Sequence, residues 1–444
     1  MGTSRYRRFS AKVRTGCKTC KTRRVKCDET QPSCLRCTSS GRICDGYIPA
    51  QSLLQQPRVS SQAPDAEQRA LHTFYTVIAP SIVSAFDVDF WTYDLLQAAK
   101  EFKTVQFAVA ALAAAYESCI LSTTSSFAQR QFVLTQYTKS INSLRQYLGK
   151  TKFRSKTQQS VALITNYLLT FLCAIQGFHT EACAHLRSGL SLIHEWGLGT
   201  VEERTKSQKT PTVLNFLVAS YTQLDTQARM KIEAIGAQTC APWSSHHVSL
   251  DGWGSGNIEQ ITRAFIQLEG LHNRAIQRTV NLCPLSRQHP PDLSIITEYQ
   301  HQLSLWDSMF AASLGTGTSP TSSSIRTLQM RRLLAQASWE RPTLPAYSYQ
   351  SHDETCREIV HLATQIIQES GLQGRGKSFN PTGALIETLY YVATRCLDDD
   401  VRWQAIDLLE KNVIVEGLWE STSAAKMAVA AVYRGGIRPE DVDY

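Results

Sequence analysis

The sequence of 444 residues predicts a small, metal-stabilised N-terminal module followed by a large all-α helical domain. Three observations predict this fold class. Six cysteines lie in a regular pattern within residues 17–44, residues 48–66 have the composition of a linker, and apolar residues recur at helical spacing over most of residues 67–444. We therefore divide the chain into a module at 1–47, a linker at 48–66 and a helical domain at 67–444.

The six N-terminal cysteines form an internal repeat. Each half has the pattern Cys-x2-Cys-x6-Cys, and six residues separate the halves. The members are Cys17, Cys20, Cys27, Cys34, Cys37 and Cys44. A thiolate pair two residues apart and a third thiolate supply three ligands to a tetrahedral metal, whereas Zn²⁺ takes four. Six thiolates complete two sites only if two of them bridge both metals, so the pattern predicts two Zn²⁺ and a small zinc-stabilised module.

A disulfide framework is the alternative explanation of this cysteine density. Three features of the sequence argue against it. The N-terminus MGTSRYRRFS lacks the apolar segment of a secretory signal peptide. The other seven cysteines of the chain are scattered singly, as free thiols are in reducing compartments, and basic residues are interleaved with the six. The sequence therefore favours a metal cluster.

The positive charge of the chain is concentrated in the module. Residues 1–47 contain 12 Lys or Arg and 3 Asp or Glu, a net of +9, whereas the whole chain has a formal net charge of +8. A compact module this basic has the charge of a surface that binds nucleic-acid phosphates. A solvated basic face, or a nuclear-import segment at Arg5, Arg7 and Arg8, is the other explanation, and both can hold together.

The cations around the cysteines are the candidate DNA contacts. Between Cys20 and Cys27 the sequence is KTRRVK, without Gly or Pro, and a Cys-x2-Cys pair can begin a short helix. Arg and Lys on such a helix can bind O6 and N7 of guanine in the major groove. The second half is less basic and contains Pro32 and Gly41, so we expect the first half to read DNA and the second to support it. The candidate DNA-binding residues are Lys18, Lys21, Arg23, Arg24, Lys26 and Arg36.

Residues 16–47, GCKTCKTRRVKCDETQPSCLRCTSSGRICDGY, resemble the fungal-type binuclear zinc cluster of fungal transcription factors. Two Cys-x2-Cys-x6-Cys segments joined by a loop with proline are the signature of that family. The resemblance implies that Cys17 and Cys34 bridge the two zincs, and that Arg23 and Arg24 contact bases of a CGG-type triplet in double-stranded DNA. It also implies a transcription factor of the RNA polymerase II type, located in the nucleus. The implied zinc ligands are Cys17, Cys20, Cys27 and Cys34 for the first ion, and Cys34, Cys37, Cys44 and Cys17 for the second.

The linker bears on the oligomeric state. Many members of that family carry a coiled coil after the cluster, which makes a dimer and sets half-site spacing. Pro49, Pro57 and Pro64 exclude a sustained heptad pattern in this chain between 48 and 66. A monomer on DNA and a homodimer formed through the large domain both remain open, and transcriptional co-regulators are the other expected partners.

The helical domain is predicted from apolar periodicity. Apolar residues recur at helical spacing in 105–119, 158–178, 183–196, 213–233, 355–370 and 383–411. Loops are predicted at 199–210 and 312–324, and the alternation typical of strands is absent. The apolar stretch 161–178 contains Thr165 and Asn166, so we expect a buried core helix and no membrane partner.

Segments of this domain resemble the fungal-specific regulatory domain that accompanies such clusters. They occur in family order at 71–99, 108–118, 185–197 and 390–421. The resemblance implies an all-α array of packed helices with a regulatory role in sensing, partner contact or control of the DNA-binding module. Members of the family often govern metabolic or biosynthetic gene clusters.

Two local patterns suggest other chemistry. Residues 371–378, GLQGRGKS, match a phosphate-binding loop, but that loop requires a preceding strand and a following helix, whereas here a predicted helix ends at Gly371. His179, Cys183 and His185 lie close in sequence but lack a fourth metal ligand. No catalytic residues are predicted, so we expect a protein that is not an enzyme. A helical enzyme or an interaction scaffold with an appended zinc module is the alternative.

Overall fold

The structure is a computed structural model. It describes residues 16–23, 25–46, 65–84, 86–121, 126–149, 154–198, 213–235, 258–280, 293–313, 323–340, 349–371 and 376–433. The contacts within the chain divide it into two units, residues 1–65 and 66–444. The predicted linker at 48–66 and the predicted loops at 199–210 and 312–324 lie almost entirely outside the described residues.

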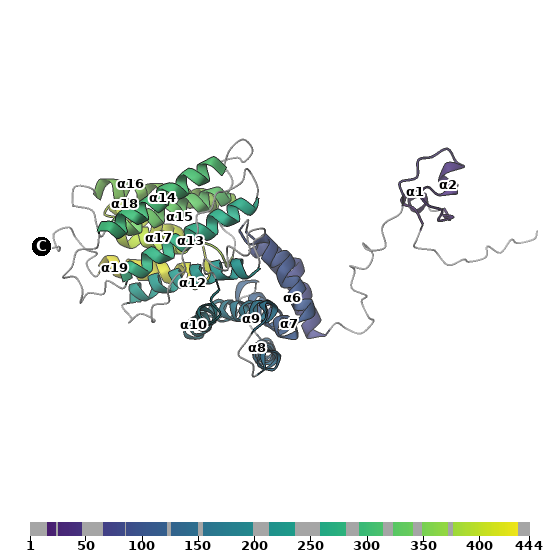
Figure 1. The fold of residues 1–444 in the computed structure, drawn as a ribbon, viewed down its shortest axis with the longest axis horizontal. Helices are drawn as coiled ribbons and strands as arrows, with labels where there is room; N and C mark the ends of the chain where they lie inside the picture. The colour runs from purple at the N-terminus through teal and green to yellow at the C-terminus, as the bar shows by residue number, and fades with distance from the viewer. Residues whose placement is uncertain are drawn as a thin grey trace, which may run out of the picture. The chain divides into compact units, whose positions relative to one another are not determined.

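The first unit contains two short helices, each begun by a Cys-x2-Cys pair (Figure 1). Helix α1 spans Lys18–Thr22 and helix α2 spans Leu35–Thr38. Cys17 and Cys34 are their N-caps, and each cap sulfur accepts a hydrogen bond from the amide of the second cysteine of its pair, at 3.3 Å. The two halves of the sequence repeat therefore fold alike, and each begins with a short helix.

The second unit is largely helical, and η denotes a π-helical turn. Its N-terminal part consists of α4 (Ala66–Thr73), η1 (Phe74–Ile78), α5 (Ala79–Ile82), η2 (Phe90–Asp94), α6 (Leu95–Glu101), α7 (Lys103–Tyr116), η3 (Glu117–Leu121), α8 (Phe127–Leu148), α9 (Lys156–Ile175) and α10 (His179–Glu195). Its C-terminal part consists of α12 (Val213–Ile235), α13 (Ile258–Val280), α14 (Leu293–Ser313), α15 (Ser323–Glu340), α16 (Tyr349–Glu369), β1 (Ser378–Asn380), α17 (Leu385–Arg395), α18 (Asp399–Lys411), β2 (Ile414–Glu416), β3 (Trp419–Glu420) and α19 (Ser421–Tyr433).

Several helices begin where the local sequence supplies a cap. Ser126 and Ser155 begin α8 and α9, and in both cases the serine and the glutamine three residues later bond to each other's backbone amides. This capping box satisfies two amides that would otherwise lack an acceptor. Asp398 accepts from the amides of Asp400 and Val401 and begins α18, so it separates α17 from α18.

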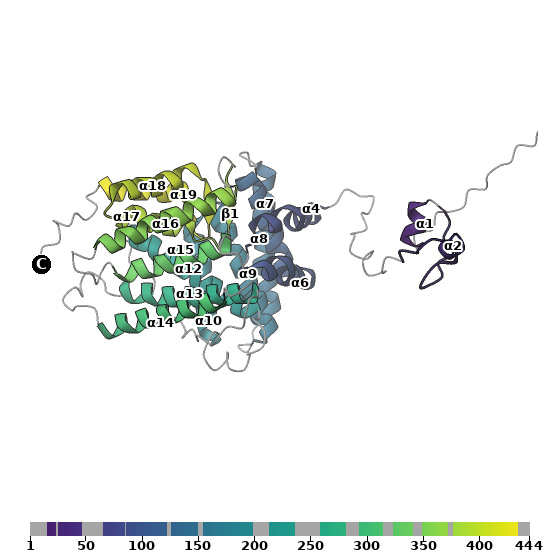
Figure 2. The same cartoon turned by 90° about the horizontal axis from the view of Figure 1, so that it is seen from above.

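Helices α7 and α9 form the centre of the first core. The side chains of α9 are buried from Val161 to Ile175, as expected for a core helix. Helix α8 packs on α7 and α10 packs on α9 (Figure 2). The segments Lys103–Leu121 and Lys156–Ile175 are long and apolar enough to cross a membrane, but 72% and 89% of their apolar windows are buried within this unit. Burial to this extent is typical of core helices in a folded domain.

Two further hydrophobic clusters fill the C-terminal part. One lies among α13, α14 and α15 around Phe265 and Trp306, and the other among α15 to α19 around Ile359 and Trp419. Figures 1 and 2 show these helices with roughly aligned axes. Helix α12 contributes Tyr221 to the first core and its C-terminal end to the last cluster, so it connects the two parts of the unit.

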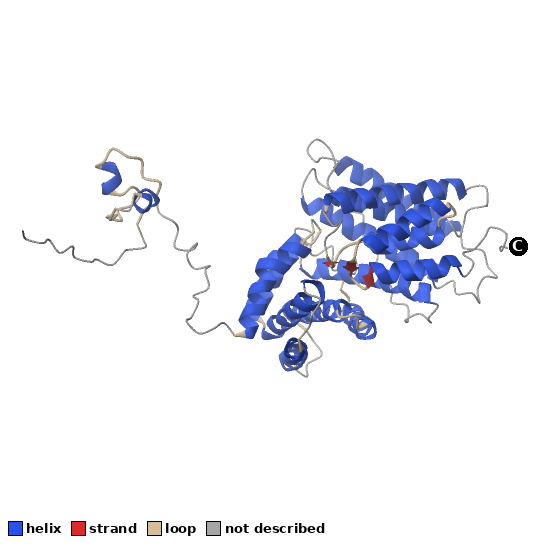
Figure 3. Cartoon of the chain, turned by 180° about the vertical axis from the view of Figure 1, so that it is seen from behind, coloured by secondary structure: helices blue, strands red, loops and turns tan. Residues whose placement is uncertain are grey.

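A small three-stranded sheet lies in this part (Figure 3). Strand β1 pairs in parallel with β2, where Phe379 faces Val415, and β2 pairs in antiparallel fashion with β3, where Glu416 faces Trp419. The sequence showed no strand pattern because each strand has only two or three residues. Alternation becomes recognisable only over about four to eight residues.

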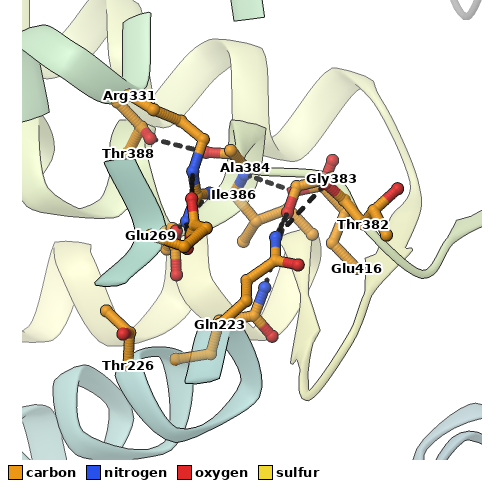
Figure 4. A network of polar contacts seen from close by, with 12 residues as sticks. Gln223, Thr226, Glu269, Arg331, Thr382, Gly383, Ala384, Ile386, Thr388 and Glu416 are labelled. Atoms are coloured by element: carbon orange, nitrogen blue, oxygen red, sulfur yellow. Dashed lines mark hydrogen bonds and ion pairs between the residues drawn. The ribbon is translucent and has the colours of Figure 1, made fainter. Parts of the chain in front are cut away.

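A polar network lies buried within the second unit (Figure 4). Arg331 on α15 forms ion pairs with Glu269 on α13 and with Glu387 on α17, and all three side chains are at most 1% exposed. The Arg331 Nη1 to Glu387 Oε1 distance is 2.7 Å. Glu416 of β2 accepts a hydrogen bond from the amide of Ile386 at 2.7 Å. One buried cation therefore lies among three buried carboxyl groups.

The same network connects α12 with the loop before α17. The amide nitrogen Nε2 of Gln223 donates to the carbonyl oxygens of Thr382 and Gly383, at 3.2 and 3.1 Å (Figure 4). Thr382 in turn donates its hydroxyl to the buried carboxyl group of Asp87, at 2.8 Å. The bond between Thr382 and Asp87 joins residues 295 positions apart in the sequence.

Candidate metal centre and nucleic-acid interface

The structure brings the six cysteines of the sequence repeat together. Their sulfur atoms form two overlapping groups of four, and within each group all sulfurs lie within 4.8 Å of one another. The groups are Cys17, Cys20, Cys27 and Cys34, and Cys17, Cys34, Cys37 and Cys44. Cys17 and Cys34 belong to both groups, and their sulfurs are 3.6 Å apart.

The spacing of the sulfurs fits zinc. Zn–S bonds of about 2.3 Å in a tetrahedron place neighbouring sulfurs about 3.8 Å apart. The sulfur of Cys34 lies 3.6 Å from that of Cys17 and 3.7 Å from that of Cys20, and the Cys17–Cys37 distance is 3.8 Å. A disulfide would require about 2.0 Å, and all six cysteines are free thiols in the structure. The distances suit two metals that share two thiolates.

The surroundings of the thiols also fit a cation. Cys17, Cys20, Cys34 and Cys37 make up the buried core of the module, and Val25 is the apolar side chain packed against them. Burial raises the pKa of the Cys17 thiol to about 12, so this thiol would remain protonated at neutral pH without a nearby positive charge. Zn²⁺ binds thiolates and offsets the cost of burying them. A core made of cysteines holds together only with metal.

Asp28 connects the first half of the module with the second. Its two carboxylate oxygens accept hydrogen bonds from the amides of Leu35 and Arg36, each at 2.9 Å, at the start of α2. The hydroxyl of Thr30 also donates to this carboxylate. The hydrogen bond from Thr30 has the largest effect on the pKa of Asp28. Together with the two amide bonds it holds that pKa well below its usual range. The carboxylate therefore stays ionised and fixes the position of α2.

The end of the module returns to its first helix. The hydroxyl of Thr19 donates to the carboxylate of Asp45 at 2.7 Å and accepts from the Asp45 amide at 3.0 Å. The amide of Lys18 donates to the carbonyl of Gly46 at 3.0 Å. Sequence reasoning missed these contacts and those of Asp28. One signal was available in the sequence: the module has only three acidic residues among many basic ones. Acidic residues that are rare in a basic module are candidates for structural hydrogen bonds.

The candidate DNA contacts lie on the surface of the module. Those in the described residues are all exposed: Lys18, Lys21, Arg23, Lys26 and Arg36. Arg24, the other predicted base contact, lies outside the described residues. Arg23 follows α1 directly, and its Nη1 atom donates to the hydroxyl of Ser40 at 3.2 Å. Exposed Lys and Arg side chains on a compact module are available to DNA phosphates.

The structure does not assemble a metal site from His179, Cys183 and His185. The Nε2 atom of His185 lies 3.0 Å from the hydroxyl of Tyr137. Within the described parts of the chain, the two cysteine groups are the sets of ligand atoms close enough together to hold a metal. His185 and Cys183 are half-buried in the helical unit, and His179 is exposed.

The elements around the segment 371–378 do not fit a phosphate-binding loop, and its residues 372–375 lie outside the described residues. The segment follows helix α16 and leads into strand β1, which is the reverse of the strand–loop–helix order that the loop requires. Lys377, which would contact the phosphates, forms an ion pair with Glu420 at 3.0 Å. Gly371, with φ of +59°, lies just after the end of α16, as the sequence predicted.

Comparison with known proteins agrees with this geometry. Residues 15–52 match the family model described as the fungal Zn(2)-Cys(6) binuclear cluster domain. The module is a fungal binuclear zinc-cluster domain. It binds two Zn²⁺, and a largely helical region follows it in the chain.

The zinc-cluster chain is similar to fungal transcription regulators. It is 24% identical to the aspercryptin biosynthesis cluster-specific transcription regulator atnN of Emericella nidulans, over 94% of this chain and 86% of that protein. Transcription regulator lscL of Purpureocillium lilacinum is 26% identical, over 39% of this chain and 47% of that protein. The Zn(2)-C6 fungal-type transcription factor afumD of Aspergillus fumigatus is 35% identical, over 24% of this chain and 33% of that protein. No solved structure matches the chain. These similarities support a DNA-binding transcription factor, consistent with a protein that is not an enzyme.

Proposed function

We propose that this zinc-cluster protein is a nuclear transcription factor of the RNA polymerase II type that recognises CGG-type triplets in double-stranded DNA. The observation that carries the proposal is the pair of overlapping cysteine groups inside the segment that holds the positive excess of the chain. The metal gives a small module a fixed shape, and the surrounding cations give that shape affinity for phosphates.

Within this proposal, all six cysteines are zinc ligands and Cys17 and Cys34 are the bridging ones. The membership of these two residues in both sulfur groups supports the assignment. Each also accepts an amide hydrogen bond as a helix N-cap, which stabilises a thiolate at that position. Because Cys17 and Cys34 are the N-caps of α1 and α2, both zincs then bind at the N-termini of the two helices. The cluster thereby sets the position of α1 relative to α2.

The proposed DNA contacts divide into two kinds. Arg23, the C-cap of α1, and Arg24, the next residue in the sequence, read bases, while Lys18, Lys21, Lys26 and Arg36 contact phosphates. Phosphate contacts set affinity and register, and base contacts set specificity. The exposure of the described members supports their availability to DNA.

The helical domain, with proposed bounds 67–444, is the regulatory part. The similarity to atnN, whose name assigns it to the aspercryptin biosynthesis cluster, extends over most of both chains. On this ground we propose that the protein regulates a metabolic or biosynthetic gene cluster, through co-regulators that contact the helical domain. A homodimer through this domain is compatible with the proposal, because the linker prolines exclude a coiled coil there.

The test is a binding measurement with the full-length, zinc-loaded protein. Fluorescence anisotropy at fixed salt would compare a duplex with one CGG triplet, a duplex with two, and a scrambled duplex of equal length. We expect tighter binding to the CGG duplexes, because each mismatched base pair costs about 1–3 kcal/mol. Equal affinity for all three would contradict the proposal. Mapping of bound sites across the genome would then identify the regulated genes.

A further inference from the structure

Arg23 and Ser40 hold equivalent positions in the two halves of the cysteine repeat. Arg23 lies three residues after Cys20, and Ser40 lies three residues after Cys37. Arg23 is the C-cap of α1, and Ser40 lies just beyond the C-cap of α2. The 3.2 Å hydrogen bond from Arg23 to Ser40 therefore joins the ends of the two short helices.

The chemistry of the two groups sets the direction of this bond. A guanidinium has only donors, so the hydroxyl oxygen of Ser40 must accept from it. The single hydroxyl proton of Ser40 remains for the carbonyls of Arg36 and Cys37, which lie 2.9 and 3.0 Å away on α2. A chain of hydrogen bonds thus runs from the Arg23 guanidinium through Ser40 to the backbone of the helix that carries Cys37.

Ser40 holds Arg23 without neutralising it. Its hydroxyl is uncharged, and within the described residues of the module Arg23 forms no ion pair with a carboxylate. A carboxylate in place of Ser40 would compete with DNA phosphates for the guanidinium. The hydroxyl occupies one of the five guanidinium N–H groups and leaves four for a base or a phosphate.

We infer that Ser40 is a positioning residue for DNA recognition, which orients the Arg23 guanidinium before DNA binds. The inference rests on the proposed function. A long side chain loses rotamer freedom when it is immobilised at an interface, and this loss weakens binding. Anchoring by Ser40 restricts Arg23 in the free protein, so less freedom is lost on binding. The second half of the repeat thereby contributes to specificity through a contact with the first half.

The experiment compares four full-length, zinc-loaded proteins: wild type, Ser40→Ala, Arg23→Ala and the double variant. Affinities are measured at fixed salt for a CGG duplex and a scrambled duplex, and zinc content is determined for each protein. We expect Ser40→Ala to weaken CGG binding roughly two- to tenfold, the range for one immobilised side chain, with a smaller effect on the scrambled duplex. In the Arg23→Ala background, the second substitution should change nothing further.

Two controls separate positioning from a general effect. Ser40→Thr keeps the hydroxyl and should bind CGG like wild type. Ser39→Ala removes the neighbouring serine, whereas the hydrogen bond of Arg23 goes to Ser40, and this variant should also be neutral.

Several outcomes would overturn the inference. They are an unchanged or increased CGG affinity of Ser40→Ala, a loss that persists in the Arg23→Ala background, and a loss of zinc. A wild-type protein that binds both duplexes equally would instead contradict the proposed function itself, and the positioning role with it.

Discussion

At the scale of single residues, Cys17 and Cys34 differ from the other four cysteines because each belongs to both sulfur groups. Cys20, by contrast, belongs to one group only. Loss of a terminal thiolate leaves one zinc with its four ligands, whereas loss of a bridging thiolate leaves both zincs with three. The geometry thus separates the six cysteines into two classes that the ligand count alone cannot distinguish.

We predict that Cys17→Ala or Cys34→Ala abolishes tight binding of both zincs, while Cys20→Ala retains part of the metal. The measurement is the zinc-to-protein ratio of the purified full-length chain after dialysis against a mild chelator. Cys119→Ala is the matched control, because Cys119 lies in the helical unit and far from the cluster in sequence. Retention of one tightly bound zinc in Cys17→Ala would exclude the bridging assignment.

Arg24 carries a second prediction at this scale. Replacement of Arg24 by Ala should cost about 1–3 kcal/mol on a CGG duplex and much less on a scrambled duplex, because a base contact contributes only at the correct base. Anisotropy titrations at one salt concentration measure both affinities. Arg42→Ala removes the same charge from the module without removing a predicted base contact. Equal losses on the two duplexes would rule out base reading by Arg24.

At the scale of elements, α1 and α2 carry exposed cations that are expected to meet phosphates. Each phosphate contact releases about one counterion, so the logarithm of affinity falls with the logarithm of salt concentration by about 0.9 per contact. Lys21 on α1 and Arg36 on α2 are exposed representatives of the two helices.

We predict that Lys21→Ala and Arg36→Ala each reduce the slope of log affinity against log salt concentration by about 0.9, the value for one phosphate contact. The reduction should be the same on specific and scrambled duplexes. Titrations over a series of salt concentrations give the slope. Lys100→Ala, an exposed lysine of the helical unit, is the control and should leave the slope unchanged. An unaltered slope in a module variant would remove that residue from the set of phosphate contacts.

The packing of α13, α15 and α17 also has a consequence at this scale. Arg331 faces Glu269 and Glu387, and Glu416 of β2 adds a further carboxyl group nearby. Burial raises the pKa of Glu387 to about 8 and the pKa of Glu416 to about 7, although Arg331 partly opposes the shift. The folded domain therefore holds protons that the unfolded chain releases above its ordinary carboxyl pKa.

These raised pKa values predict how stability changes with pH. A pKa raised by folding contributes stability that is present below the unfolded value and is lost as pH rises toward the folded value. The free energy of unfolding should therefore fall as the pH rises from 6 to 8. Glu387→Gln should reduce this dependence, and denaturant unfolding at several pH values would show it. Exposed Glu410→Gln is the control; an identical pH profile in Glu387→Gln would contradict the prediction.

At the scale of the whole molecule, each unit depends on a different source of stability. The first unit has a core of cysteines and one partly buried valine, so its folding is coupled to metal. The second unit has three large hydrophobic clusters and buries polar groups among them. Removal of zinc should therefore affect the DNA-binding module and leave the helical unit folded.

The apolar periodicity of the sequence predicted the all-α class of the domain, but it did not predict every helix. Helices α8, α13, α14 and α15 were not predicted. Polar residues such as Gln136 on α8, Glu269 on α13 and Arg331 on α15 lie buried and interrupt the apolar pattern, whereas α9 is buried from Val161 to Ile175 and was evident. The three short strands were also missed, since their pairing joins β1 to residues more than 30 positions later. Local sequence carries no signal for such a pairing.

The sequence by itself determined the zinc module, its two-metal stoichiometry and its basic surface. These depend on ligand spacing and charge within some 30 consecutive residues, so they are local properties. Only the tertiary structure decided that Asp28 holds α2, that Ser40 anchors Arg23, and that Arg331 lies buried between two glutamates. Those contacts form when segments that are distant in the sequence pack together, and burial then determines which side chains stay ionised. The spacing of residues along the chain does not predict such contacts.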